Sequence, residues 1–160
     1  MDRLNFAQLV LLTGVVATVT LDLWQGVVSR VFGLPRTNWA LVGRWIGHIP
    51  GGRISHEAIA TTAPVRHEAI IGWVAHYLVG IAYAAIYLGF LRFVLDWEPG
   101  VATALGFGIV TVVAPWFLMQ PAMGLGIMGT KTPRPGVVQA QSLSSHAAFG
   151  VGLALCAASI

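Results

Sequence analysis

The sequence predicts an all-α integral membrane bundle of four transmembrane helices with a short interfacial amphipathic helix, formed as a single domain over residues 1–160. Two observations predict this fold class. Apolar residues make up 56% of the chain, only 9% are charged, and the mean hydropathy is +0.76. A soluble domain has about 25% charged residues, so this shortage of charge is typical of surface that faces hydrocarbon. Long apolar segments separated by polar connections supply the spans.

Four apolar segments are each long enough to cross a bilayer, because a span needs about 20 largely apolar residues at about 1.5 Å each. We expect spans at about residues 6–28, 69–95, 101–120 and 142–160. No small-residue cleavage site follows the first segment, so we expect it to remain as a permanent span.

The connection between the first two spans, about residues 36–66, is predicted to contain the amphipathic helix. Thr37 or Asn38 is a suitable N-cap. The apolar residues that recur at helical spacing after it are Trp39, Val42, Trp45, Ile46 and Ile49. Two tryptophans on a short amphipathic helix suit the headgroup layer of a membrane.

Basic residues predict the orientation. The first connection carries Arg36, Arg44, Arg53 and Arg66, and the third carries Lys131 and Arg134, whereas the second is acidic. In a four-span bundle the first and third connections share one side, which the positive-inside rule makes cytoplasmic, with both termini on the opposite side. The net charge of +3 is scattered through loops, so we expect no nucleic-acid partner.

Residues 121–130 are apolar but rich in glycine, and Pro115 and Pro121 precede or open this stretch. Either the third helix continues with kinks, or it breaks and a short piece re-enters the membrane edge. Irregular backbone at that depth requires protein or water to satisfy its polar groups. A kinked continuation is the favoured interpretation.

Each span contributes one polar residue to the cytoplasmic half of the bundle: Asp22, His76, Gln120 and His146. At about 1.5 Å per residue, Asp22, His76 and His146 lie roughly 6–10 Å inside the span ends. Small residues at helical spacing from these side chains are typical of helix contact surfaces in membranes. We therefore predict one shared polar layer inside the bundle.

This polar layer is the candidate ligand- or proton-binding site. A buried acid costs about 2.5–3.5 kcal/mol on insertion scales, so Asp22 needs a partner, water or a proton, and His76 and His146 are natural partners. The functional alternatives are a proton relay, a metal site or a polar ligand pocket. The structural alternative is an interhelical hydrogen-bond network that fixes packing.

Four polar residues of the first connection, Arg44, His48, His56 and Glu57, are predicted to form the cytoplasmic mouth of that site. No cofactor is predicted. Histidine with Met119, Met123 and Met128 would suit copper or haem by ligand softness, but these residues lack tight ligand spacing. The single cysteine, Cys156, excludes an intramolecular disulfide.

Several stretches together resemble the bacterial family called domain of unknown function 2938. They are Leu21–Trp24, Leu41–His48, His56–Ala60, Gly72–Tyr77, Ala114–Gly124 and Lys131–Pro133. The resemblance covers nearly the whole chain and implies a small multi-pass protein of the bacterial inner membrane with unassigned activity. The motif residues it implies are Asp22, Arg44, His48, His56, Glu57, His76 and Gln120.

Two function classes follow from these observations. The first is a membrane-embedded binding or transport protein for a small molecule or proton, with Asp22 and His76 at its centre. The second is an accessory or assembly subunit of a larger membrane complex, whose polar layer only packs helices; a homo-oligomer also fits the small-residue faces. The sequence shows no nucleophile–base pair or complete metal-ligand set, so an enzyme is not favoured.

Overall fold

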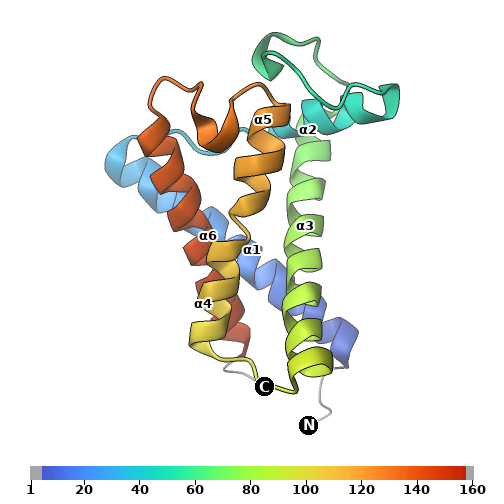
Figure 1. Cartoon of the computed structure of the whole chain (residues 1–160), viewed down its shortest axis with the longest axis vertical. Helices are drawn as coiled ribbons and strands as arrows, with labels where there is room; N and C mark the ends of the chain where they lie inside the picture. Colours follow the sequence, from blue (N-terminus) through green and yellow to red (C-terminus); the bar gives the residue numbers. More distant parts are fainter. Residues whose placement is uncertain (1–4, 158–160) are drawn as a thin grey trace. The chain divides into compact units, whose positions relative to one another are not determined.

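The computed structural model describes residues 5–157, and Figure 1 follows its helices along the chain. Every regular element in this range is helical, and the range contains no strand. The α-helices are α1 (Phe6–Phe32), α2 (Trp39–His48), α3 (Glu68–Phe90), α4 (Val101–Val110), α5 (Gln120–Ala122) and α6 (Pro135–Ala157). Shorter elements are the 3-10 turns η1 (Ile49–Gly51), η2 (Ile59–Thr61) and η5 (Ile127–Gly129), and the π-helical turns η3 (Leu91–Leu95) and η4 (Pro115–Met119). The predicted all-α class is confirmed.

Three segments of the described range are long and apolar enough to cross a membrane: Phe6–Phe32, Glu68–Leu95 and Val101–Ala122. They correspond to the first three predicted spans. Helix α6 has 23 residues, but polar side chains such as Gln139 and Gln141 in its first half make it less apolar than these three. The predicted fourth span, 142–160, is therefore not confirmed, and its residues 158–160 lie outside the described range.

Local sequence signals explain the ends of α1. The Asn5 side chain accepts a hydrogen bond from the Gln8 backbone N–H at 2.9 Å, and the Gln8 side chain accepts one from the Asn5 N–H at 3.0 Å. This reciprocal pair is a capping box. Gly33 ends the helix in a left-handed conformation with φ of 64°, which glycine adopts without steric cost. The helix thus continues a few residues beyond the predicted end at about residue 28.

The predicted amphipathic helix of the first connection exists as α2. Asn38 is the N-cap, because its side chain accepts hydrogen bonds from the backbone N–H groups of Ala40 at 3.1 Å and Leu41 at 3.4 Å. The helix ends at His48, and Pro50 and Gly52 take the chain out through η1.

The third apolar segment is interrupted between α4 and α5. Pro115 has no backbone N–H and cannot bond to the Thr111 carbonyl four residues earlier, and a turn lies at Thr111 and Val112. The chain then widens into η4, where the Gln120 N–H bonds to the Pro115 carbonyl in a π-helical pattern.

The favoured continuation of this helix through residues 121–130 is wrong. The α-helix ends at Ala122, the Leu125 N–H bonds to the Gln120 carbonyl at 2.9 Å, and the Gly124 N–H bonds to the Pro121 carbonyl at 3.0 Å. These two bonds form a Schellman motif around Gly124, whose φ is 84°. Glycine at the position after the helix end permitted this turn and stopped the helix.

The described residues form two compact units. Unit 1 comprises 5–34, 77–111 and 144–157, and unit 2 comprises 35–76 and 112–143. The unit 1 core is formed by the buried side chains of Val10, Ala17, Leu21, Ala84, Tyr87, Leu88, Leu91, Ala104, Phe149 and Leu153. Small residues let its helix backbones approach closely: Gly80 packs against Thr18, and Gly152 packs against Ala17.

Unit 2 has a smaller apolar core of Val42, Ile59 and Met123. The closest backbone approach in this unit joins α2 to the start of α3. A Cβ on Gly43 would overlap the Glu68 carbonyl oxygen, and a Cβ on Gly72 would overlap that of Trp39. The two glycines therefore set how near α2 lies to α3.

Gly72→Ala tests this close approach. We expect it to lower the free energy of unfolding by about 1–3 kcal/mol, because the added methyl group forces two backbones apart. Thermal unfolding in detergent can be followed by reaction of the buried thiol of Cys156 with a fluorogenic maleimide. The matched control is Gly89→Ala on the same helix, where no described heavy atom lies within 4 Å of the new Cβ. Equal unfolding temperatures for the two variants would contradict the packing argument.

Candidate functional site

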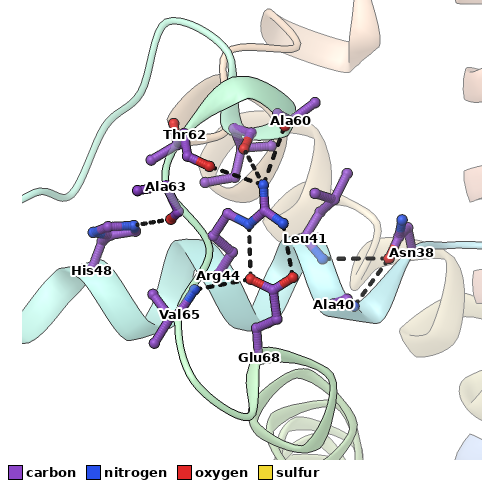
Figure 2. Close-up of polar contacts among 11 residues, drawn as sticks. Asn38, Ala40, Leu41, Arg44, His48, Ala60, Thr62, Ala63, Val65 and Glu68 are labelled. Carbon is purple, nitrogen blue, oxygen red and sulfur yellow. Dashed lines mark hydrogen bonds and ion pairs between the residues drawn. The ribbon is translucent and has the colours of Figure 1, made fainter.

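Arg44 organises the polar part of unit 2. Its Nε donates to Glu68 Oε2 and its Nη2 donates to Glu68 Oε1, each at 2.8 Å, so the guanidinium and the carboxylate form a two-bond ion pair. Its Nη1 faces the carbonyl oxygens of Ile59 at 3.4 Å, Ala60 at 3.2 Å and Thr62 at 3.0 Å. Figure 2 shows the guanidinium between the carboxylate and this turn of the loop.

Glu68 fixes the start of α3 through the same contact. Its Oε2 also accepts the Val65 backbone N–H at 3.1 Å, and the Glu68 N–H donates to the Val65 carbonyl at 3.1 Å. The carboxylate raises the pKa of the Arg44 guanidinium above its ordinary value, first through the hydrogen bonds and then through its charge. Arg44 is therefore a permanent cation at this position.

Two more side chains of α2 hold the loop that follows it. Trp45 Nε1 donates to the Ile54 carbonyl at 2.8 Å. His48 Nε2 lies 2.9 Å from the Ala63 carbonyl oxygen, and because a carbonyl only accepts, this nitrogen carries the proton (Figure 2). Together with Arg44, these side chains attach the loop to α2 at Ile54 and between Ile59 and Ala63.

These contacts divide the four residues predicted for the cytoplasmic mouth. Arg44 and His48 use donors to hold the loop, which favours a positioning role for both. Glu57 is exposed to solvent. His56 is buried, with 6% of its surface exposed. The ligand contacts predicted for these side chains stay predictions.

His56 is the unusual member of this group. Neither of its ring nitrogens makes a hydrogen bond to any group of the described chain. Its ring centroid lies 5.3 Å from that of His48. Burial lowers the pKa of His56 below its ordinary value, and Arg53 and the nearby His48 lower it further. The Ala122 backbone, which lies near the ring without making a hydrogen bond of full geometry, opposes this shift only in part. The imidazole is therefore neutral at pH 7, with one nitrogen as donor and one as acceptor.

A cavity of about 500 Å³ opens beside His56. Its polar lining side chains are Arg53, Ser55, His56, Glu57, Thr61 and Thr62. All of them come from the loop that α2 holds, so the shape of the cavity depends on the bonds of Arg44, Trp45 and His48.

Asp22 and His146 bond to hydroxyl groups of other helices within unit 1. The Tyr77 hydroxyl of α3 donates to Asp22 Oδ2 at 3.2 Å. His146 Nδ1 lies 2.8 Å from Thr111 Oγ1, and this hydroxyl itself donates to the Gly108 carbonyl at 2.6 Å. The hydroxyl therefore accepts from His146, whose Nδ1 carries the proton.

His76 stacks on an aromatic side chain in unit 2. Its ring centroid lies 3.8 Å from that of Trp39, with 22° between the planes, and Trp73 contacts it edge-on at 5.8 Å. Trp73 and His76 at the start of α3 thus form a cluster of three flat rings with Trp39 of α2.

Gln120 is buried in unit 2, with 5% of its surface exposed. Its Oε1 accepts no hydrogen bond from the described residues, and the same holds for donation by the Trp116 indole Nε1 one turn earlier. A solvent-shielded acceptor and donor therefore lie four residues apart on one helical segment.

The shared polar layer stays a prediction. Asp22 and His146 belong to unit 1, and His76 and Gln120 belong to unit 2. The contacts described above join Asp22, His146 and His76 to neighbours in their own units. Within residues 5–157, no three His, Cys, Asp or Glu side chains come together as a metal site would require.

Sequence reasoning missed the partners Tyr77, Thr111 and Glu68, and the polar atom of Trp116. Tyr77 and Trp116 stand in stretches that carry the family resemblance, which was an available signal. No sequence signal pointed to Thr111 or Glu68, because their roles depend on how the helices pack against one another.

Residues 11–160 match the family described as Protein of unknown function (DUF2938). The chain belongs to this family. The DUF2938 match includes every candidate site residue from Asp22 to His146. No curated protein and no solved structure matches the chain. Membership of DUF2938 therefore confirms the family resemblance and assigns no activity.

Arg44→Lys tests the role of the guanidinium. Lysine keeps the charge but cannot reach a carboxylate and three carbonyls at once. We expect amide hydrogen exchange across residues 59–68 to become at least about tenfold faster, because the loop loses its donors. Exchange mass spectrometry measures this directly.

The control for this experiment is Arg36→Lys, at an exposed arginine of the same connection. Unchanged exchange in Arg44→Lys, or equal acceleration in both variants, would show that the loop does not depend on the Arg44 fork.

Proposed function

We propose that the protein is a membrane-embedded binding or transport protein for a small polar molecule. One observation carries the proposal: Trp116 Nε1 and Gln120 Oε1 are shielded from solvent and have no hydrogen-bond partner among the described residues. Both lie in the apolar segment Val101–Ala122. A solute with an acceptor and a donor would satisfy both atoms.

Energetics support a binding role for this pair. Leaving a buried donor or acceptor unsatisfied costs about 1–3 kcal/mol, so such atoms are uncommon unless they serve a function. Trp116 lies within η4 and Gln120 directly follows it, and π-helical turns occur frequently at functional sites. The segment thus combines two energetically unfavourable features, which are the unsatisfied polar atoms and the π-helical turn.

In this proposal Asp22 handles a proton. Its carboxylate lies on an apolar helix and accepts from the Tyr77 hydroxyl of α3, and an acid within a membrane span is typical of proton relays. His76 and His146 complete the proposed polar layer, and proton movement through it would drive solute movement.

The proposed location is the bacterial inner membrane, with the first and third connections in the cytoplasm and both termini in the periplasm. The arginines of the first connection and Lys131 and Arg134 of the third support this orientation. Four spans are part of the proposal, with α6 as the fourth.

A second candidate function is an accessory or assembly subunit of a larger membrane complex or homo-oligomer. The hydrogen bonds of Asp22 to Tyr77 and of His146 to Thr111 favour it, because both join side chains of different helices as a packing network does. In this alternative the polar residues stabilise the fold and move no solute or proton.

Gln120→Leu tests the binding site. We expect the variant to unfold at the same temperature as wild type or above it, because it removes a buried acceptor that no described group satisfies. We also expect it to lose ligand stabilisation, measured as the shift in unfolding temperature across a panel of amino acids, sugars and carboxylates. The contrasting control is Gln139→Leu, which should lower stability because Gln139 Nε2 donates to the Met128 carbonyl at 3.2 Å.

Asp22→Asn separates the two candidate functions in the same preparations. Proteoliposomes containing a pH-sensitive dye, placed under a potassium diffusion potential, report proton flux. Normal expression with lost flux supports transport. Lost co-purification of partner subunits, with no flux even in wild type, favours the assembly role and overturns the transport proposal.

Labelling of single cysteines tests the orientation. In a Cys156→Ser background, Gly52→Cys and Glu98→Cys put a thiol in the first and second connections. We expect a membrane-impermeant maleimide added to whole cells to label only the Glu98→Cys variant. Labelling of the Gly52→Cys variant before lysis would reverse the proposed topology.

A further inference from the structure

We propose that the cavity formed by residues 53–63 binds an oxyanion, which is the phosphoryl or carboxylate group of a small solute or of a lipid headgroup. The inference deepens the proposed function and rests on it, since it gives the binding protein an anion contact in the loop that follows α2. Four features of unit 2 support it.

The first feature is His56 itself. It lines the cavity, only 6% of its surface is exposed, and both ring nitrogens stay without a partner in the part of the chain that is described. The shielded imidazole N–H has no hydrogen bond within the described chain, so it keeps its capacity to donate to a ligand oxygen.

The second feature is the imbalance between donors and acceptors around the cavity. Loop carbonyl oxygens are already used, because Arg44 bonds to those of Ile59, Ala60 and Thr62. The Ala58 carbonyl accepts from the hydroxyls of Thr61 and Thr62, each at 3.1 Å. In contrast, the Arg53 guanidinium has no hydrogen bond or ion pair to any of residues 5–157 and lines the cavity with His56.

The third feature is charge. The Arg53 guanidinium lines the cavity together with His56 and opposes protonation of that ring, so a fixed positive charge lies near it. An oxyanion has the complementary charge and can accept from the imidazole and the guanidinium together. Glu57 also lines the cavity, and its negative charge opposes an anion. Removing that charge should therefore strengthen anion binding, whereas removing the charge of Arg53 should weaken it.

The fourth feature is rigidity. The His56 N–H donates to the Ala122 carbonyl at 2.8 Å, and the Arg53 N–H donates to the His48 carbonyl at 3.2 Å. The backbone on both sides of the donors is therefore fixed before a ligand arrives, which reduces the entropy cost of binding.

Calorimetry of the full chain in maltoside detergent tests the inference with inorganic phosphate as the probe. We expect Arg53→Gln to weaken phosphate binding by about tenfold or more, because it removes a charged donor. We expect Glu57→Gln to strengthen binding by about threefold, because it removes a like charge. His56→Phe should abolish binding, and Arg36→Gln should change nothing.

A second arm identifies the source of the oxyanion. The protein is placed in nanodiscs of phosphatidylcholine with and without phosphatidic acid, and native mass spectrometry counts retained lipid. A heat of binding measured with inorganic phosphate supports a soluble anion as the ligand. Retention of phosphatidic acid that depends on Arg53 supports a lipid headgroup. Binding of neither probe overturns the inference, as does a change of the same sign in Arg53→Gln and Glu57→Gln.

The outcome is separable from that of the proposed function. Arg53 and Glu57 are exposed, so their variants fold whatever happens to His56→Phe. Lost phosphate binding with retained proton flux removes only the anion site, whereas phosphate binding without any solute or proton movement removes only the transport proposal.

Discussion

Arg44 connects three parts of the chain through one side chain: helix α2, the first residue of α3 and the turn η2 between them. An irregular loop lacks the regular backbone hydrogen bonds of a helix or sheet, so its carbonyl groups need donors from other parts of the chain. A planar guanidinium supplies them in fixed directions while it also pairs with a carboxylate. The positions of His56, of the cavity beside it and of the start of α3 all depend on this arrangement.

The guanidinium reaches both partners only because α2 and α3 approach so closely. Gly43, next to Arg44, packs its Cα against the Glu68 backbone, and Gly72 packs against that of Trp39. Any side chain at these positions would separate the helices and lengthen the ion pair. Small residues and one long cation thus act together: the glycines set the distance, and Arg44 bridges it.

Features that depend on neighbouring residues could be predicted from the sequence. The Asn38 cap, the amphipathic α2 and the three apolar segments follow from side chains a few positions apart. The break at Thr111 follows from Pro115. The helix end at Ala122 was misjudged, because a left-handed Gly124 becomes decisive only once the loop carbonyl of Glu57 packs against it. Pairings such as Asp22 with Tyr77 could not be predicted, since they depend on the rotation of one helix against another. The burial of His56 could not be predicted either, because most loop residues are exposed to solvent.

Backbone N–H groups of the loop after α2 form hydrogen bonds with carbonyl groups at the end of the third apolar segment. His56 donates to the Ala122 carbonyl at 2.8 Å and Ile59 donates to that of Met123 at 3.0 Å, so two carbonyls at the end of α5 take their donors from the loop. Gln120 lies only two residues before Ala122. Any axial displacement of α5 must therefore either break these two bonds or pull the imidazole along with it. A displacement of the Gln120 amide would therefore be transmitted to the loop through the backbone between Gln120 and Met123 and through these two hydrogen bonds.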